Sequence, residues 1–99
     1  MIRVVLPAHL RTLAGVAESE ICIDAPGDAS IDSLIGALEL RFPQLLDTIR
    51  DRTTGRRRPF VRYFACSRDL SHDDARDTLP HAVIAGDEPF LIVGAMAGG

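Results

Sequence analysis

The 99-residue chain contains no lysine, and all eleven of its basic side chains are arginine. It therefore has no side-chain amine that could accept an isopeptide bond. Cysteine is scarce as well, because Cys22 and Cys66 are the only two. Two cysteines are too few for the disulfide framework of a small secreted domain. Neither they nor the three histidines have the spacing of metal ligands, so we expect no metal site.

An excess of positive charge and long apolar runs are missing too. The net charge is −3, which gives no general basis for binding nucleic acid or an anionic membrane surface. No apolar run is long enough to span a bilayer, and the first residues lack the charged and apolar segments of a signal peptide. With 46% hydrophobic residues, the sequence predicts a single globular domain. We expect it to be cytoplasmic, with no nucleic-acid or membrane partner.

Four segments have the apolar content and alternation of β-strands. They span residues 2–6, 19–24, 60–66 and 90–93. The first two predict an antiparallel hairpin joined by a loop over residues 7–18. Any further strand is expected to be short and to lie within the polar stretch 67–78.

Residues 30–42 carry the pattern of an amphipathic helix. Ser30 can cap its first turn, and Pro43 ends it because the residue before a proline avoids the α conformation. Apolar side chains recur between them at helical spacing: Ile31, Leu34, Ile35, Leu38 and Phe42. Pro43 can also begin a second short helix that reaches Ile49.

The order of these segments predicts an α+β domain in which one main helix lies across one face of a mixed sheet of four or five strands. The polar stretch 51–59 is predicted to be a solvated loop. It includes the run Arg56-Arg57-Arg58, and a run of three charges in an acidic domain is typical of an exposed loop.

The chain finishes with five small or flexible residues, Ala95-Met96-Ala97-Gly98-Gly99, directly after the last predicted strand. Consecutive glycines lack Cβ atoms and can pass through a slot too narrow for a side chain. When extended, the five residues reach on the order of 16 Å from the domain. That length suits the presentation of a terminal carboxylate inside another protein's active site. The alternative is a frayed terminus without a role.

These features together resemble the MoaD/ThiS family of ubiquitin-like sulfur carriers. The matching segments are Leu6-Pro7-Ala8-His9-Leu10-Arg11, the helix pattern from Ser30 to Glu39, Phe60-Val61, Gly86-Asp87-Glu88 and the tail ending in Gly98-Gly99. The resemblance covers nearly the whole chain. It implies a β-grasp domain over residues 1–94 with a flexible tail at 95–99. It also implies that the first and last strands are parallel neighbours at the sheet centre, with Cys22 and Cys66 at opposite edges and unable to form a disulfide.

The resemblance further implies what the tail does. An E1-like partner enzyme adenylates the carboxylate of Gly99 with ATP, and a sulfur donor converts it to a thiocarboxylate. A sulfur-accepting synthase is then the second partner. In this scheme Ala97 and Gly98 form the slim part of the tail, and the chain itself binds no cofactor and is a carrier, not an enzyme.

The alternation of the strands also predicts a partner-binding surface. Phe60, Phe64, Leu91 and Val93 are apolar but fall on the outward face of the predicted sheet, and Met96 follows them in the tail. A contiguous apolar patch on a small protein marks a partner site. A wrong register, or cover by the loop that contains the arginine run, would remove the patch.

The sequence leaves the pathway open. We expect cysteine or molybdopterin biosynthesis, with a thiamine-thiazole carrier or a carrier for a secondary metabolite as other possibilities. Two functions of other classes also fit: a ubiquitin-like protein modifier joined to targets through Gly99, and a β-grasp interaction module with an inert tail.

Overall fold

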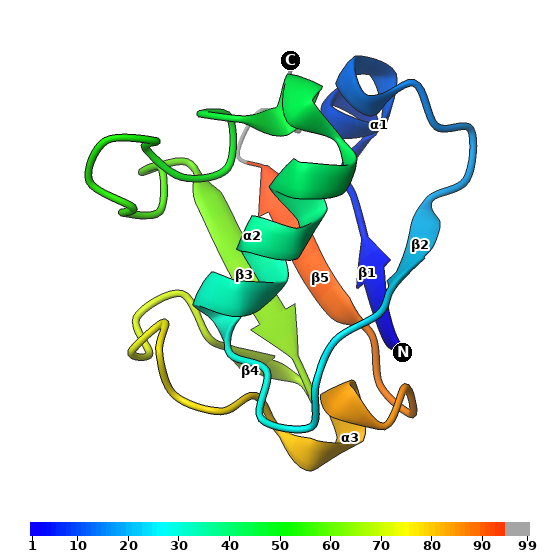
Figure 1. The fold of residues 1–99 in the computed structure, drawn as a ribbon, viewed down its shortest axis with the longest axis vertical. Coiled ribbons are helices and arrows are strands. Elements are labelled where there is room, and N and C mark those ends of the chain that lie inside the picture. Colours follow the sequence, from blue (N-terminus) through cyan, green and yellow to red (C-terminus); the bar gives the residue numbers. More distant parts are fainter. Residues whose placement is uncertain (95–99) are drawn as a thin grey trace.

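The fold is built on one five-stranded mixed sheet with the strand order β2-β1-β5-β3-β4 (Figure 1). The computed structural model describes residues 1–94, so the predicted tail at 95–99 lies outside the described residues. The elements in chain order are β1 Ile2–Val5, α1 Ala8–Ala14, β2 Glu20–Ile23, α2 Ile31–Arg41, the 3₁₀ helix η1 Pro43–Leu45, β3 Val61–Ala65, β4 Arg68–Asp69, α3 His81–Ile84 and β5 Phe90–Gly94. The expected α+β class is confirmed. Within residues 1–94, no helix is both long and apolar enough to cross a membrane.

The two strands at the centre of the sheet come from opposite ends of the chain. β1 and β5 are parallel, with Val4 opposite Phe90, whereas β1–β2, β3–β5 and β3–β4 are antiparallel. The parallel centre confirms the arrangement implied by the resemblance to the β-grasp proteins. Cys22 lies in the edge strand β2, and Cys66 follows β3 near the opposite edge of the sheet, so the two free thiols are as widely separated as the resemblance implied.

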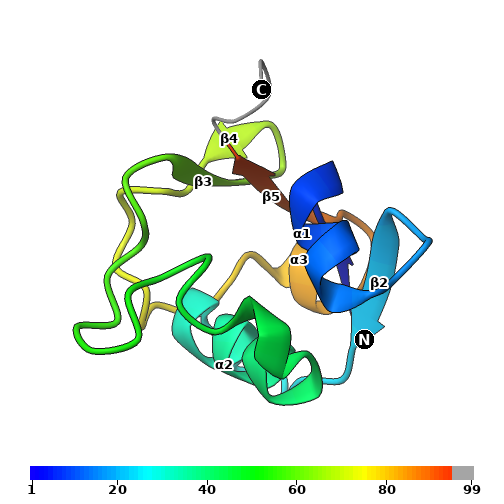
Figure 2. The same cartoon turned by 90° about the horizontal axis from the view of Figure 1, so that it is seen from above.

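The core lies between the sheet and α2, which forms a second layer over one face (Figure 2). The strand residues predicted to face inward are buried, and so is the apolar stripe of α2 up to Leu38. Ser30 caps α2 as predicted, because its hydroxyl accepts the backbone N–H of Ser33 at 3.1 Å. Beyond α2, Leu45 of η1 and the nearby Ile49 are also buried in the core.

The connection between the first two strands differs from the prediction. Residues 7–18 contain a helix, α1, where a loop was expected. Pro7 precedes its first residue, and Gly15 ends it in the left-handed conformation with φ of 73°. A proline at the start and a glycine just past the end are typical of the boundaries of a helix. The helix has only seven residues, of which Leu10 is the buried one, and so short an apolar pattern did not reveal it.

The segment 51–59 is a loop as predicted, but its arginine run is only partly solvated. Arg57 donates from Nη1 to the carbonyl oxygen of Val61 at 2.6 Å and from Nε to that of Ser71 at 3.1 Å. Arg58 donates from Nε to the carbonyl oxygen of Asp47 at 2.9 Å and forms an ion pair with its carboxylate. These two side chains therefore satisfy backbone carbonyls and hold the loop to the domain. Of the three arginines, Arg56 is the exposed one.

Tyr63 gives the core a spectroscopic probe, since it is the chain's single tyrosine and there is no tryptophan. Its side chain is buried against Phe90, with 5.4 Å between the ring centroids. Desolvation by burial raises the pKa of its hydroxyl from 10.0 to about 12. We therefore expect an absorbance titration of the folded protein to show a midpoint near 12, and the urea-unfolded chain to titrate near 10.

The same shift sets the alkaline limit of stability. The pKa of the Tyr63 hydroxyl is higher in the folded chain than in the unfolded chain. The contribution of the protonated hydroxyl to the free energy of unfolding is therefore fully present below pH 10, and it is lost as the pH rises through about 12. A shift of this size corresponds to roughly 3 kcal/mol of unfolding free energy. A single midpoint near pH 10 in both folded and unfolded protein would contradict this burial of the hydroxyl.

Candidate functional site: the outer face of the sheet and the end of β5

Apolar side chains form a row across the three central strands on the face of the sheet opposite α2. The register places Leu91 of β5 opposite Val5 of β1 on one side and Phe64 of β3 on the other. Two residues further along β5, Val93 is opposite Arg62 of β3. The guanidinium of Arg62 forms an ion pair with Asp69 of the edge strand β4 at 3.3 Å. The apolar row is therefore bordered by charged residues toward the β4 edge, as in the polar rim of a binding surface.

The exposure of these residues agrees with their predicted orientation. Phe60 and Val93 are 70% and 41% exposed, and Phe64 and Leu91 are half-buried. The loop of residues 56–59 thus does not cover Phe60. We call the surface of Val5, Phe60, Phe64, Leu91 and Val93 the outer sheet face; that it binds a partner stays a prediction.

A groove of about 650 Å³ continues the outer sheet face past the end of β5. One wall of the groove is formed by the sheet and the other by the start of α1. The lining residues are Val5, Leu6, Leu91, Ile92, Val93 and Gly94 on the sheet side and Pro7, Ala8, His9 and Thr12 on the α1 side. It lies where the described part of the chain ends, at Gly94. The groove was not predicted because its second wall is α1, which the sequence pattern did not reveal.

His9 lies directly against the backbone of Gly94. A Cβ atom built on Gly94 would be 2.6 Å from Cε1 of the His9 ring, closer than carbon atoms approach without contact strain. Any side chain at position 94 would therefore displace His9 from the groove. The signal that could have pointed to this contact is the glycine itself, since glycine in a strand indicates a close approach.

The start of β5 is fixed by a turn that binds to β1. Arg3 donates from Nε to the carbonyl oxygen of Gly86 at 2.8 Å and from Nη2 to that of Asp87 at 3.0 Å. Gly86 has φ of 83°, and a Cβ there would lie 3.0 Å from the carbonyl oxygen of Met1. This turn requires glycine, and it sets the register that brings Leu91 beside Val5 and Phe64.

The remaining predicted site residues are Met96, Ala97, Gly98 and Gly99, and all four lie outside the described residues. Within residues 1–94, no group of three histidine, cysteine, aspartate or glutamate side chains is placed to hold a metal ion. The described part of the site is an apolar face that continues into a groove.

No protein-family model matches the chain, and no curated protein matches its sequence. Several solved structures are similar to it in fold, among them SAMP1 and two CysO proteins. SAMP1 from Haloferax volcanii has a TM-score of 0.74 at 18% identity, covering 98% of this chain and 97% of that chain. CysO in the Amycolatopsis orientalis BexX/CysO complex has a TM-score of 0.75 at 18% identity, covering 100% of both chains. Mycobacterium tuberculosis CysO has a TM-score of 0.73 at 21% identity, covering 96% and 99%. At these identities the likeness shows the fold, and it confirms the ubiquitin-like β-grasp that the resemblance implied.

Proposed function

We propose that this chain, which has the fold of SAMP1 and CysO, is a sulfur carrier that works through the carboxylate of Gly99. The observation that best supports the proposal is the position of β5. It is a central strand of the sheet, it contributes Leu91 and Val93 to the outer sheet face, and it ends at the groove beside His9. A partner that docks on this face therefore contacts the strand from which residues 95–99 continue.

The chemistry requires two partner enzymes. In the first, the Gly99 carboxylate attacks the α-phosphorus of ATP, which forms an acyl-adenylate and releases pyrophosphate. Hydrosulfide then attacks the activated carbonyl carbon and displaces AMP, so that one oxygen of the carboxylate is replaced by sulfur. A persulfide donor instead forms an acyl disulfide with loss of AMP, and a second thiol then cleaves the S–S bond to release the thiocarboxylate. The second enzyme accepts this sulfur on an electrophilic carbon. The carrier contributes the reacting carbon, a slim tail through Ala97 and Gly98, and a docking surface that can be reused.

The expected partners are thus an E1-like adenylating enzyme and a sulfur-accepting synthase in the cytoplasm. We favour cysteine or molybdopterin biosynthesis as the pathway. Two of the similar structures are CysO proteins, and one of them is described in a complex with BexX. These likenesses support a carrier that forms complexes with other proteins, with cysteine biosynthesis slightly preferred.

A second candidate is a protein modifier that is joined to amines of target proteins through Gly99. The observation in its favour is the fold likeness to structures described as small archaeal modifier protein 1. The chain has no lysine of its own, so as a modifier it would not build polymers through its own side chains.

Mass spectrometry of cells that make the protein separates the two candidates. A carrier is expected to occur free, with an intact mass raised by the difference between a sulfur and an oxygen atom. A modifier is expected to remain attached to lysines of other proteins, and trypsin should leave on them a branch of residues 77–99, because Arg76 is the last arginine of the chain. Deletion of Gly98-Gly99 should abolish either signal, whereas full function after this deletion would mean that the tail is inert.

A further inference from the structure

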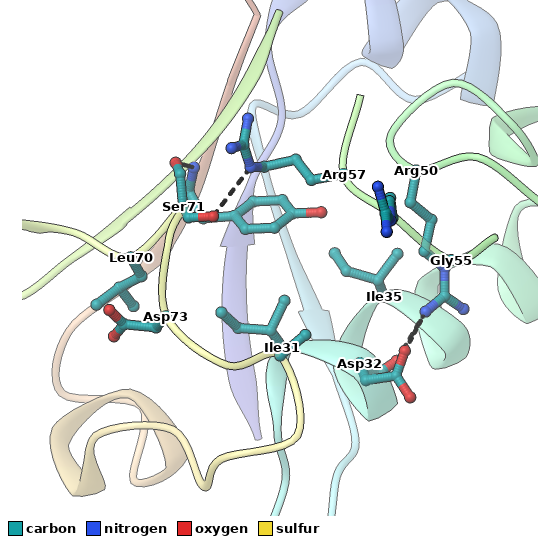
Figure 3. A pocket seen from close by; sticks show the side chains of 12 residues that line it. Ile31, Asp32, Ile35, Arg50, Gly55, Arg57, Leu70, Ser71 and Asp73 are labelled. Carbon is teal, nitrogen blue, oxygen red and sulfur yellow. Dashed lines mark hydrogen bonds and ion pairs between the residues drawn. The ribbon is translucent and has the colours of Figure 1, made fainter. Parts of the chain in front are cut away.

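A second cavity lies on the other side of the sheet, away from the outer sheet face. It has a volume of about 370 Å³ and opens between the first half of α2, the loop of residues 50–57 and the segment 70–75 (Figure 3). This volume lies in the range of small-molecule sites. The lining residues are Ile31, Asp32, Ile35, Arg50, Gly55, Arg56, Arg57, Tyr63, Leu70, Ser71, Asp73 and Ala75.

Tyr63 contributes its hydroxyl group to this cavity. The residue is only 4% exposed and lines the cavity, and its hydroxyl makes no hydrogen bond with any residue from 1 to 94. Around it, Ile31, Ile35 and Leu70 supply an apolar wall. The cavity therefore offers the Tyr63 hydroxyl, as one donor and one acceptor, to a ligand that has an apolar body.

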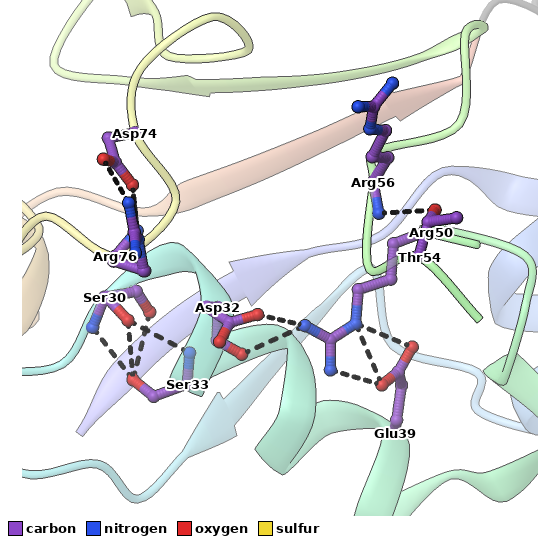
Figure 4. A network of polar contacts seen from close by, with 9 residues as sticks. All are labelled: Ser30, Asp32, Ser33, Glu39, Arg50, Thr54, Arg56, Asp74 and Arg76. Carbon is purple, nitrogen blue, oxygen red and sulfur yellow. Dashed lines mark hydrogen bonds and ion pairs between the residues drawn. The ribbon is translucent and has the colours of Figure 1, made fainter. Parts of the chain in front are cut away.

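Among the charged side chains that line the cavity, one arginine is available to bind a ligand. Arg50 is engaged by the carboxylates of Glu39 and Asp32 (Figure 4). Arg57 is engaged by backbone carbonyls, as described above, and Asp73 lies 3.5 Å from Arg68. Arg56 also lines the cavity, and its side chain makes no ion pair or hydrogen bond within the described chain. A free guanidinium beside an apolar cavity recognises a carboxylate or a similar anion.

We propose that this cavity binds a small amphipathic monocarboxylate. Its apolar body would lie against Ile31, Ile35 and Leu70, a polar atom would bond to the Tyr63 hydroxyl, and its carboxylate would bind Arg56. The carboxylates of Asp32 and Asp73 at the rim disfavour a ligand with a second negative charge. Because Tyr63 faces inward on β3 and Phe64 faces outward, this ligand and a protein on the outer sheet face can be bound together.

Indole-3-acetate is a suitable probe, because it combines an apolar ring, one N–H group and one carboxylate. In an amide ¹H–¹⁵N NMR titration of the full chain we expect saturable shifts at millimolar concentrations, centred on residues 31–35, 55–57 and 70–73. The neutral analogue indole-3-acetamide should bind about tenfold more weakly, because it lacks the charge-assisted bond to Arg56.

Two variants test the assigned residues without breaking a contact of the free protein. Arg56→Gln should weaken binding of indole-3-acetate about tenfold, and Tyr63→Phe about fivefold. Arg52→Gln is the matched control, because Arg52 is an exposed arginine of the same loop that does not line the cavity. The proposal is overturned if no saturable shifts occur, if they fall outside the cavity, if the amide binds equally well, or if Arg56→Gln behaves like Arg52→Gln.

Discussion

A variant with Phe64→Ala and Leu91→Ala is expected to bind its activating enzyme at least about 100-fold more weakly than the unchanged protein. The two side chains are cross-strand neighbours at the centre of the outer sheet face. Central apolar side chains of an interface each contribute on the order of 2 kcal/mol or more, and the two together account for the expected change. Isothermal titration calorimetry with the E1-like enzyme measures it, and sulfur transfer should fall in parallel.

Leu40→Ala is the matched control for this loss. Leu40 is 85% exposed but lies on α2, on the opposite side of the domain, so its truncation removes a similar apolar side chain from outside the outer sheet face. Both proteins should keep the amide NMR spectrum of a folded chain. Unchanged affinity in the double variant, or an equal loss with Leu40→Ala, would show that the partner binds elsewhere.

Arg50→Met is expected to lower the free energy of unfolding by about 3 kcal/mol, the largest single-residue effect on stability that we predict. Arg50 donates from Nη2 to Oε1 of Glu39 at 2.8 Å, and the Glu39 side chain is only 8% exposed. Burial opposes the charge on Arg50, but the carboxylates of Glu39 and Asp32 raise its pKa above the ordinary value. Without the guanidinium, the Glu39 carboxylate is left buried without its cation. Urea denaturation measures the change.

Two further variants separate this effect from a general loss of charge. Glu39→Met combined with Arg50→Met should recover most of the stability, since an apolar pair replaces a buried ion pair at little cost. Arg76→Met removes an arginine that pairs with Asp74 on the surface, and it should leave the urea midpoint unchanged. An Arg50→Met protein with the midpoint of Arg76→Met would refute the structural role of this ion pair.

Local sequence patterns predict the strands and α2 because their buried residues recur at a fixed period. Ile21 and Ile23 of β2, and Phe90 and Ile92 of β5, alternate with outward residues, and all four are buried. The same alternation identified Phe64 and Leu91 as outward-facing. Pairing of β1 with β5 joins opposite ends of the chain, so it followed from the resemblance to the family and not from the alternation.

The features that sequence patterns missed depend on contacts between distant segments. The helix α1 has only seven residues and buries Leu10 alone, which is too short an apolar pattern to distinguish from a loop. The groove beside His9 was missed with it. Arg57 and Arg58 have the composition of a solvated run, but carbonyl oxygens of Ser71 and Asp47 are their partners. The cavity around Tyr63 likewise combines three segments that only the tertiary fold brings together.

The most direct test of a carrier that works through Gly99 is the intact mass of the protein after incubation with the E1-like enzyme of its own organism, ATP and a sulfide source. We predict a rise by the difference between a sulfur and an oxygen atom, which is absent without ATP and absent after deletion of Gly98-Gly99. An unchanged mass in the complete mixture, with an enzyme shown to bind the outer sheet face, would contradict the assignment.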